Sequence, residues 1–407
     1  MPAHVIFAAP FFMEATLRFV RGAAKLPGID LTIVSQDPFE KLPADLRDSV
    51  AGHWRVDNAL DAAQLADAAR NLASRFGPVQ RYFGVLEHMQ VQLAVAREAL
   101  GVEGVTAEQA RNFRDKSRMK DVLQAAGVPC ARHQLAGSAD AARRFAGEVG
   151  FPLVVKPPAG AGSKGTYRLD SGDDLEAYLA AHPHSEEHPS LYEEFVQGDE
   201  HSFDSVMIDG KVVWHSISRY QPAPLVVLEN PWIQWCVILP RDISGPEYDP
   251  IRRAAEDALH ALGLDFGLSH MEWFRLGNQR IAISEVGARP PGEQLNAMLG
   301  YSHDISFFDA WPRLMVTGEF DVPERLYASG TAYLRGQGQG TVRAVHGLDE
   351  IQARYGDLVV EAKLPKPGRP ANDSYEGEGN IIIRHPETEV VEKALADIIS
   401  TVRVEIR

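Results

Sequence analysis

The sequence predicts a protein of mixed α/β and α+β class, with an N-terminal parallel α/β domain and a C-terminal α+β lobe. Three observations lead to this prediction. Residues 1–105 alternate short apolar runs with helical patterns, as in a parallel sheet covered by helices. Residues 190–290 contain strand patterns joined by tight turns such as Asp209-Gly210, which indicates hairpins. The chain has 407 residues, enough for two to four domains.

The N-terminal domain is expected to contain strands that alternate with helices. The strands are His4–Ala9, Asp30–Ser35 and Arg81–Leu86, and the helices are Ala15–Ala24, Ala59–Arg75 and Gln90–Leu100. No GxGxxG motif follows the first strand, so a Rossmann cofactor site is not supported. Glu87 directly follows the third strand, where ligands collect in parallel sheets. The alternative is a charge at a helix N-terminus, where the helix dipole favours it.

A basic segment follows this domain. Ala107–Ala126 is predicted to form one long helix, with Gly127 as its C-cap and Pro129 as a stop. Lys116 lies in this helix among acidic and basic neighbours. A mixed charge cluster of this kind is usually a solvated helix face, and that alternative stays open for Lys116.

A glycine-rich segment comes next. Leu153–Val155 is predicted as a buried strand that places Lys156 at its end. The following residues, Pro157–Gly165, include three glycines, Ser163 and Lys164. Such a loop can bring backbone N–H groups around phosphate oxygens. It is not a Walker A motif, because GxxxxGK[ST] does not occur in it, and the alternative is a surface turn.

Residues 191–240 are predicted to hold strands and then an irregular aromatic segment. Leu191–Ser205 is interpreted as two strands, and Met207–Ser218 continues the sheet. The segment 219–240 carries Arg219, Tyr220 and Trp232 with little periodicity. Irregular aromatic segments between ordered elements often bind ligands. The alternative is a cover over the face of the sheet.

The stretch Leu268–Gly292 is predicted to be a hairpin that carries two glutamates. If its loop is Gly277-Asn278 alone, Glu272 lies opposite Ile283 and shares one face with Glu285. Two such carboxylates repel each other unless a cation lies between them. Hard oxygen ligands suit Mg²⁺ or Mn²⁺, and the alternative is a solvated hairpin with surface glutamates.

The remainder is predicted to be helix Asp249–Leu262, helix Ile305–Val316, a boundary near Glu319–Glu324 and a small α+β lobe without obvious chemistry. The net charge of −15 argues against a nucleic-acid-binding surface. Two cysteines at no metal-ligand spacing fit a reducing, cytoplasmic environment. No apolar run is long enough for a membrane span, and the apolar N-terminus is interpreted as a strand rather than a signal peptide.

Five motifs together resemble the ATP-grasp superfamily. They occur in the order RDKSRMK, LVVKPPAGAGSKG, YEEFVQGDE, HMEW and ISEVGARPPG. The resemblance implies an ATP-grasp fold with a pre-ATP-grasp α/β domain at residues 1–105 and an ATP-grasp domain at 106–318. The latter would have a small lobe near 120–190 and a large lobe near 190–318. Residues 319–407 would be a C-terminal lobe similar to that of biotin-carboxylase-like members.

The resemblance also implies roles for individual residues. Nucleotide contacts are expected from Lys116, Lys156, Ser163, Lys164, Glu193, Glu194, Val196 and Glu200. The metal carboxylates would be Glu272 and Glu285, and the catalytic residues Arg289 and Lys156. Substrate contacts are expected from Glu87, Arg219, Tyr220, Trp232, His270 and Arg289. Gly287 stands where the family often has an asparagine ligand, which indicates a weaker or water-completed second metal.

Among superfamily members, EVGARPPG and the C-terminal lobe are most similar to L-amino acid ligases. This resemblance implies an ATP- and Mg²⁺-dependent ligase, with Mn²⁺ as an alternative, that joins amino acids through an acyl phosphate. It leaves a homodimer open. The alternatives are a carboxylase or nucleotide-biosynthesis ligase of the same superfamily, and a catalytically silent nucleotide-binding module.

Overall fold

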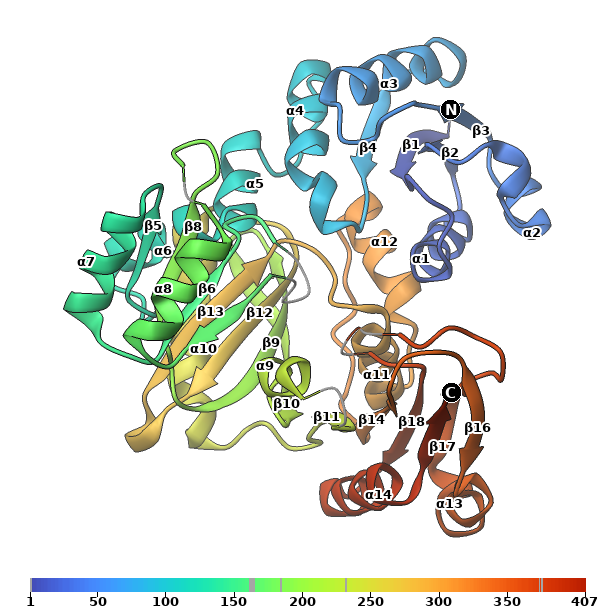
Figure 1. Cartoon of the computed structure of the whole chain (residues 1–407). Helices are drawn as coiled ribbons and strands as arrows, with labels where there is room; N and C mark the ends of the chain where they lie inside the picture. Colours follow the sequence, from blue (N-terminus) through green and yellow to red (C-terminus); the bar gives the residue numbers. More distant parts are fainter. Residues whose placement is uncertain (1, 161–164, 184, 231–232, 373, 375) are drawn as a thin grey trace.

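The N-terminal domain contains a parallel sheet, as predicted. The computed structural model describes residues 2–160, 165–183, 185–230, 233–372, 374 and 376–407. The sheet has the order β3-β2-β1-β4 (Figure 1). Its strands are β1 (Ala3–Ala8), β2 (Ile29–Ser35), β3 (Gly52–Arg55) and β4 (Val79–Phe83), and its helices are α1 (Glu14–Ala24), α2 (Ala44–Arg47), α3 (Ala62–Phe76) and α4 (Gln90–Leu100). Strand β3 was not predicted, because its sequence GHWR has no apolar run.

The predicted long helix after this domain is wrong, because the chain breaks at Asp115. Helix α5 (Ala107–Arg114) ends there and α6 (Lys116–Ala125) begins. Asp115 adopts an extended conformation, and its carboxylate accepts hydrogen bonds from the backbone N–H groups of Ser117 and Arg118. The break places Lys116 at the first position of α6, where its N–H donates to the carbonyl of Pro158 at 2.8 Å.

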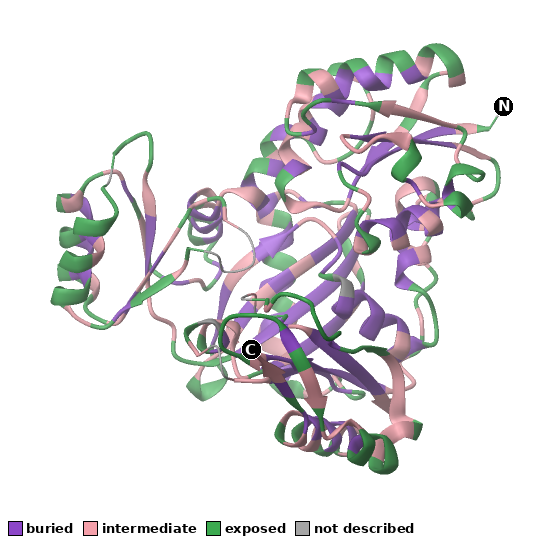
Figure 2. Ribbon diagram, turned by 45° about the vertical axis from the view of Figure 1, so that its right-hand side comes forward, coloured by how far each residue is buried: buried purple, intermediate pink, exposed green. Residues whose placement is uncertain are grey.

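A small four-stranded antiparallel sheet follows, in the order β5-β8-β6-β7. Its elements are β5 (His133–Ala136), α7 (Ala139–Val149), β6 (Leu153–Lys156), β7 (Tyr167–Leu169), α8 (Gly172–Ala181) and β8 (Ser190–Glu194). Alanine, leucine and aromatic side chains of α7 and α8 pack on this sheet. Figure 2 shows the helical layer over this sheet exposed on its outer side and buried where it meets the sheet.

An antiparallel eight-stranded sheet forms the centre of the molecule, in the order β13-β12-β9-β10-β11-β14-β18-β17. Its strands are β9 (Asp199–Ile208), β10 (Lys211–Gln221), β11 (Trp235–Leu239), β12 (Gly267–Arg275), β13 (Ile281–Gly287), β14 (Ala328–Leu334), β17 (Val359–Lys363) and β18 (Gly379–His385). Helices α6 and α10 (Asp249–Leu262) pack on one face. Helices α11 (Glu293–His303) and α12 (Phe307–Thr317) pack on the other.

The segment predicted to be irregular, 219–240, is largely ordered. It contains the end of β10, the short helix α9 (Pro224–Glu229) and β11. The prediction is wrong for Trp235–Leu239, which lies in the interior of the sheet and is buried along its whole length.

The C-terminal residues continue the central sheet rather than forming a detached unit. Strands β14, β18 and β17 extend it beyond β11. A second sheet, in the order β15-β19-β16, and two helices complete this region (Figure 1). They are β15 (Gly336–Gln337), β16 (Val342–His346), α13 (Leu348–Tyr355), α14 (Thr388–Thr401) and β19 (Arg403–Ile406). The division of the chain into units at 1–105, 106–318 and 319–407 remains a proposal, in which the third unit shares the central sheet with the second.

Trp311 on α12 fixes the N-terminal domain to the rest of the molecule. Its ring makes edge contacts with Phe7, Phe19 and Phe83, with centroids 5.3–6.3 Å apart. A continuous apolar core consequently extends from β1 to the central sheet. Among the residues described, none of the helices is long and apolar enough to cross a membrane.

Candidate active site

The hairpin β12–β13 places Glu272 and Glu285 on one face of the central sheet, but by a different register from that predicted. The loop is longer than Gly277-Asn278, since Leu276 donates to the carbonyl of Arg280. This shifts the pairing by one residue, so that Trp273 lies opposite Ile283. A bulge then shifts it by one more, and Glu272 lies directly opposite Glu285. The two shifts restore the side-chain parity.

The same face continues across two further strands, β9 and β10. Glu272 lies opposite Ser202 on β9, and Ser202 lies opposite Ser218 on β10. Because alternate residues of a strand share a face, Glu200 and Tyr220 point to the same side as Glu272. The face therefore runs from carboxylates on β13, β12 and β9 to an aromatic residue on β10.

A cavity of about 340 Å³ lies between this face and the small sheet. It is lined by most of the residues predicted to bind nucleotide, which are Lys116, Lys156, Glu193, Glu194, Val196 and Glu200. The two predicted metal carboxylates, Glu272 and Glu285, also line it. Both sheets contribute to it. The end of β8 and the residues after it form one wall, and β12 and β13 form the other.

Glu193 connects two lysines at the inner end of this cavity. Its Oε1 lies 2.8 Å from Nζ of Lys156 and 3.5 Å from Nζ of Lys120. Burial alone would raise the pKa of Glu193, but the two ammonium groups outweigh it and lower the pKa. Burial lowers the pKa of Lys120, which is fully enclosed. For Lys156, burial opposes the charge, yet Glu193 and Glu285 outweigh it and raise the pKa.

Lys116 forms an ion pair with Glu285 at the other end. Burial opposes the charge on Glu285, but Lys116 and Lys156 dominate and hold its pKa at about 2. Burial and the neighbouring Glu285 raise the pKa of Glu272. The pKa of Glu200 also rises well above its ordinary value, because of burial and the charge on Glu272. This part of the site thus holds more negative charge than its lysines neutralise.

The excess negative charge fits a divalent cation. Among the described residues, no group of three or more His, Cys, Asp and Glu side chains could hold a metal ion by itself. Mg²⁺ is commonly held by one or two carboxylates together with substrate phosphates. Glu272 and Glu285, paired across two strands, match that mode and would hold a metal that arrives with a nucleotide.

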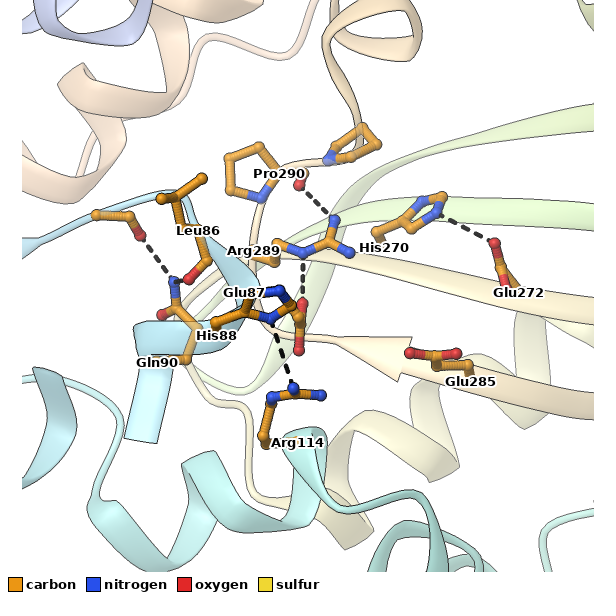
Figure 3. Close-up of polar contacts among 12 residues, drawn as sticks. Leu86, Glu87, His88, Gln90, Arg114, His270, Glu272, Glu285, Arg289 and Pro290 are labelled. Atoms are coloured by element: carbon orange, nitrogen blue, oxygen red, sulfur yellow. Dashed lines mark hydrogen bonds and ion pairs between the residues drawn. The ribbon is translucent and has the colours of Figure 1, made fainter. Parts of the chain in front are cut away.

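A second cavity, of about 320 Å³, begins at the same two glutamates. Glu87, Tyr220, His270 and Arg289 line it, all of which were predicted to contact substrate. Figure 3 shows Arg289 next to Glu87, with Glu272 and Glu285 further along the hairpin. Arg289 donates its Nε–H to Glu87 and an Nη1–H to the carbonyl of Pro290. Burial opposes the charge of Arg289, but Glu87 outweighs it and raises the pKa.

The carboxylate of Asp204 fixes the orientation of the His270 ring. Its Nδ1 lies 2.7 Å from Oδ1 of Asp204, which is almost fully buried. Ser202 donates to the second oxygen of Asp204, and Ser218 shares a hydrogen bond with Ser202. Burial lowers the pKa of His270, but Asp204 outweighs it and raises the pKa. The other ring nitrogen lies 3.9 Å from Glu272 (Figure 3).

Arg219 is not part of either cavity. Tyr220 faces the site, so the preceding residue points to the opposite face of β10. There Arg219 binds Glu392 and the hydroxyl of Tyr248. The prediction that it contacts substrate is therefore corrected. Three further predicted residues, Ser163, Lys164 and Trp232, lie outside the described residues.

Lys120 and Asp204 are polar residues of the site that were not predicted. Lys120 lies one helical turn after Lys116, and this i,i+4 spacing was the signal that could have identified it. Its Nζ also donates to the carbonyl of Ser284 on β13. The sequence did not identify Asp204, because its contact in the site is a hydrogen bond to His270, a residue distant in the sequence.

Comparisons with known proteins find an ATP-grasp domain in this chain. The family model of the ATP-grasp domain matches residues 121–292, which include Glu272, Glu285 and Arg289. The uncharacterized protein y4rH of Sinorhizobium fredii is 26% identical in a matched region that covers 79% of this chain. The chain thus spans only 63% of the length of y4rH. The L-arginine-specific L-amino acid ligase of Bacillus subtilis is 22% identical, over 82% of this chain and 80% of its own.

Solved structures confirm the fold. The L-amino acid ligase from Bacillus licheniformis superposes with a TM-score of 0.78 at 20% identity, covering 100% of this chain and 99% of its own. A carboxyaminoimidazole ribonucleotide synthase from Aspergillus clavatus, complexed with ATP, has a TM-score of 0.70 at 17% identity, covering 98% of both chains. The predicted ATP-grasp fold is thus confirmed. Two of these proteins are named as L-amino acid ligases.

Proposed function

We propose that this chain, in which residues 121–292 form an ATP-grasp domain, is an ATP-dependent carboxylate–amine ligase. Its reaction would form an amide or peptide bond through an acyl phosphate and release ADP and phosphate. The proposed substrates are two amino acids, and the product a dipeptide. One observation carries the proposal: the nucleotide cavity and the substrate cavity meet at Glu272 and Glu285, which line both.

The chemistry requires such a junction. A carboxylate is a poor electrophile, because it has no usable leaving group. When its oxygen attacks the γ-phosphorus of ATP, ADP departs and the carboxyl carbon gains a phosphate leaving group. An amine then attacks that carbon, phosphate departs, and the nitrogen loses a proton. The protein must align the reacting groups and neutralise their charge.

The described residues can be assigned to these tasks. Lys156 and Lys116, both close to the metal carboxylates, would bind phosphate oxygens of the nucleotide. A divalent cation held by Glu272 and Glu285 would neutralise charge on the transferred phosphoryl group. Arg289 would bind the carboxylate and then stabilise the acyl phosphate, because its planar guanidinium matches both anions. Glu200 would accept hydrogen bonds from the ribose hydroxyls.

The alternative carboxylase or nucleotide-biosynthesis ligase is less well supported. A phosphorylated ribose substrate needs several cations in its pocket. In the part of the substrate cavity that the structure describes, the cationic groups are Arg289 and the imidazole of His270; the other lining side chains are carboxylates, neutral polar groups and apolar or aromatic groups. A catalytically silent module is also disfavoured, because both glutamates and both lysines of the proposed chemistry converge on one junction.

The test is a panel of amino-acid pairs with ATP and Mg²⁺, in which released phosphate, ADP and dipeptide are measured together. We expect one ADP, one phosphate and one dipeptide per turnover, dependent on both amino acids. Stoichiometric AMP and pyrophosphate would contradict the acyl-phosphate route. Turnover only with bicarbonate or a phosphorylated amine would support the alternative ligases instead.

A further inference from the structure

Three consecutive backbone carbonyls beyond the end of β6 are bound by the junction of α5 and α6. The N–H of Lys116 donates to the carbonyl of Pro158 at 2.8 Å. Nη1 of Arg114 donates to the carbonyl of Gly160 at 2.9 Å, and its Nη2 donates to the carbonyl of Ala159. One short stretch of chain is therefore attached, through three hydrogen bonds, to the two residues that flank the break between the helices.

The local sequence explains both sides of this contact. Pro157 and Pro158 directly follow β6, and proline has no N–H, so the chain leaves the ladder of the sheet and its carbonyls need donors from elsewhere. On the other side, the first N–H groups of a helix have no acceptor within the helix, and Lys116 is the first residue of α6. The guanidinium of Arg114 is a planar fork that can donate to two acceptors at once.

The contact joins the two segments that carry the lysines proposed to bind phosphate. Lys116 is two residues after Arg114, and Lys156 directly precedes residues 157–160. Both lysines line the nucleotide cavity, and so does Gly160. The position of one ammonium group relative to the other therefore depends on how residues 157–160 are held against α5 and α6.

The N-terminal domain supports Arg114 from behind. Helix α5 packs on α4 of that domain through three buried alanines, which are Ala94, Ala107 and Ala110. The N–H of Ala107 donates to the carboxylate of Glu98 on α4 at 2.8 Å. Nη2 of Arg114 also lies 3.5 Å from Nδ1 of His88, next to the substrate cavity (Figure 3). The guanidinium thus stands on a packed helix and can hold residues 157–160 in place.

Resting on the nucleotide site of the proposed ligase, we infer that Arg114 is a positioning residue for nucleotide binding. It holds residues 157–160 by two carbonyls and thereby sets the positions of Lys116 and Lys156 around the nucleotide phosphates. Arg114 is not among the described residues that line the nucleotide cavity, so it acts through this segment and not on the nucleotide itself. The geometry of the fork matters more than its charge, because both acceptors are neutral carbonyls.

The experiment measures the dissociation constant of ADP with Mg²⁺ for three variants, well below the melting temperature of each. Arg114→Met removes the fork, whereas Arg114→Lys keeps the charge but loses the two-acceptor geometry. Arg111→Met is the matched control, because Arg111 is exposed and lies three residues earlier on the same helix. We expect both Arg114 variants to bind ADP at least ~10-fold more weakly than the wild type, the scale of misplaced binding groups. The control should bind ADP as the wild type does.

Three results would overturn the inference. If Arg114→Lys binds ADP as tightly as the wild type, the charge alone is sufficient and the fork has no role. If Arg111→Met loses as much affinity as Arg114→Met, the effect comes from the net charge of α5. The melting temperature of the nucleotide-free protein should be the same in Arg114→Met and Arg111→Met, because the Arg114 side chain is only half-buried. A lower melting temperature in Arg114→Met alone would assign the residue to folding instead.

Steady-state kinetics add a second readout where a pair of amino acids is ligated. Arg114→Met should raise the KM for ATP and lower kcat, while the KM for the carboxylate substrate stays within about twofold of the wild type. A rise in the KM for the carboxylate substrate alone would overturn the inference. Failure of the ligase function is recognised separately, because the ADP titration needs no amino acid: no pair would then release ADP, and the three dissociation constants would still decide the role of Arg114.

Discussion

Arg289 donates its Nε–H to Glu87, a residue 202 positions earlier in the chain. The pair joins the loop after β13 to the short helical turn that follows β4 (Figure 3). The orientation of the arginine in the substrate cavity is therefore controlled by a residue of the N-terminal domain. A site built mainly on the central sheet thus includes a residue of the N-terminal domain.

The first prediction follows from this pair. Glu87→Gln retains an acceptor but removes the charge that stabilises the guanidinium, so Arg289 should lose its fixed orientation. We expect kcat/KM for the carboxylate substrate to fall by ~10–100-fold, the scale of a misplaced substrate-binding group. The KM for ATP should change less than about twofold, because Glu87 does not line the nucleotide cavity. Glu103→Gln is the control, since the Glu103 side chain is 88% exposed.

Glu285 is the subject of the second prediction. Glu285→Gln preserves size but removes a hard anionic ligand, and it leaves Lys116 without its partner. Turnover at limiting Mg²⁺ should fall by at least ~100-fold, on the scale of losing one strong transition-state contact. The exposed Glu256→Gln serves as the control. Near-normal turnover would show that Glu285 has no part in metal binding.

The third prediction tests whether Lys156 and Lys120 bind the nucleotide or only stabilise the fold. Lys156→Ala should raise the KM for ATP and lower kcat, because its ammonium is close to both Glu193 and the metal carboxylates. Lys120 is fully buried and bonded to the carbonyl of Ser284, so Lys120→Met should also act on ATP binding. A change in kcat alone, at unaltered KM for ATP, would mean that neither lysine binds the ground-state nucleotide.

Stability gives a fourth prediction, from the same cluster. Glu193→Ala leaves two buried ammonium groups without their shared carboxylate and should destabilise the fold by about 3–5 kcal/mol. Lys120→Met should cost less, because Glu193 keeps Lys156. Urea denaturation of both variants measures the difference. Equal losses in the two variants would contradict the shared-carboxylate arrangement.

The sequence predicted the glutamate pair but not how the fold achieves it. The prediction assumed a two-residue loop, and the shared face survived because loop and bulge each shifted the register by one residue. Neither shift has a strong local signal. In the loop, Gln279 adopts a positive φ angle, which is uncommon for that residue type. The bulge falls at Ser284, between Ile283 and Glu285, where no glycine marks it. The sequence could thus predict that Glu272 and Glu285 share a face. Which residues pair between β12 and β13 depended on packing and could not be predicted.

Motifs that lie on one strand or helix were predicted well, whereas contacts between distant segments were not. Lys156 follows a buried strand, so its position could be read from local sequence. The orientation of Arg219 depended on the register of β10 against β9, which places Tyr220 in the cavity and its neighbour on the other face. The break at Asp115 was missed because the helical pattern continues across it, although its carboxylate caps α6.

Buried histidines give the last prediction, on the pH dependence of stability. Burial lowers the pKa of His201, His215 and His303 to about 4. The unfolded chain therefore binds more protons than the folded one between about pH 6.5 and pH 4. Their contribution is complete above pH 6.5 and is lost as the pH falls towards 4. Each histidine should steepen the decline of the unfolding free energy by up to about 1.4 kcal/mol per pH unit.

His215→Phe tests this account at one position. The His215 ring stacks on Phe203 at 5.0 Å between centroids, and its Nε2 is buried without a hydrogen-bond partner. A phenyl ring can occupy the same place without binding a proton, and it removes the unsatisfied nitrogen. Urea denaturation at pH 7, 5.5 and 4.5 measures how the unfolding free energy declines as the pH falls. In His215→Phe this decline should correspond to the uptake of about one proton fewer on unfolding than in the wild type. An unchanged decline in His215→Phe would mean that this histidine is as easily protonated in the folded protein as in the unfolded chain.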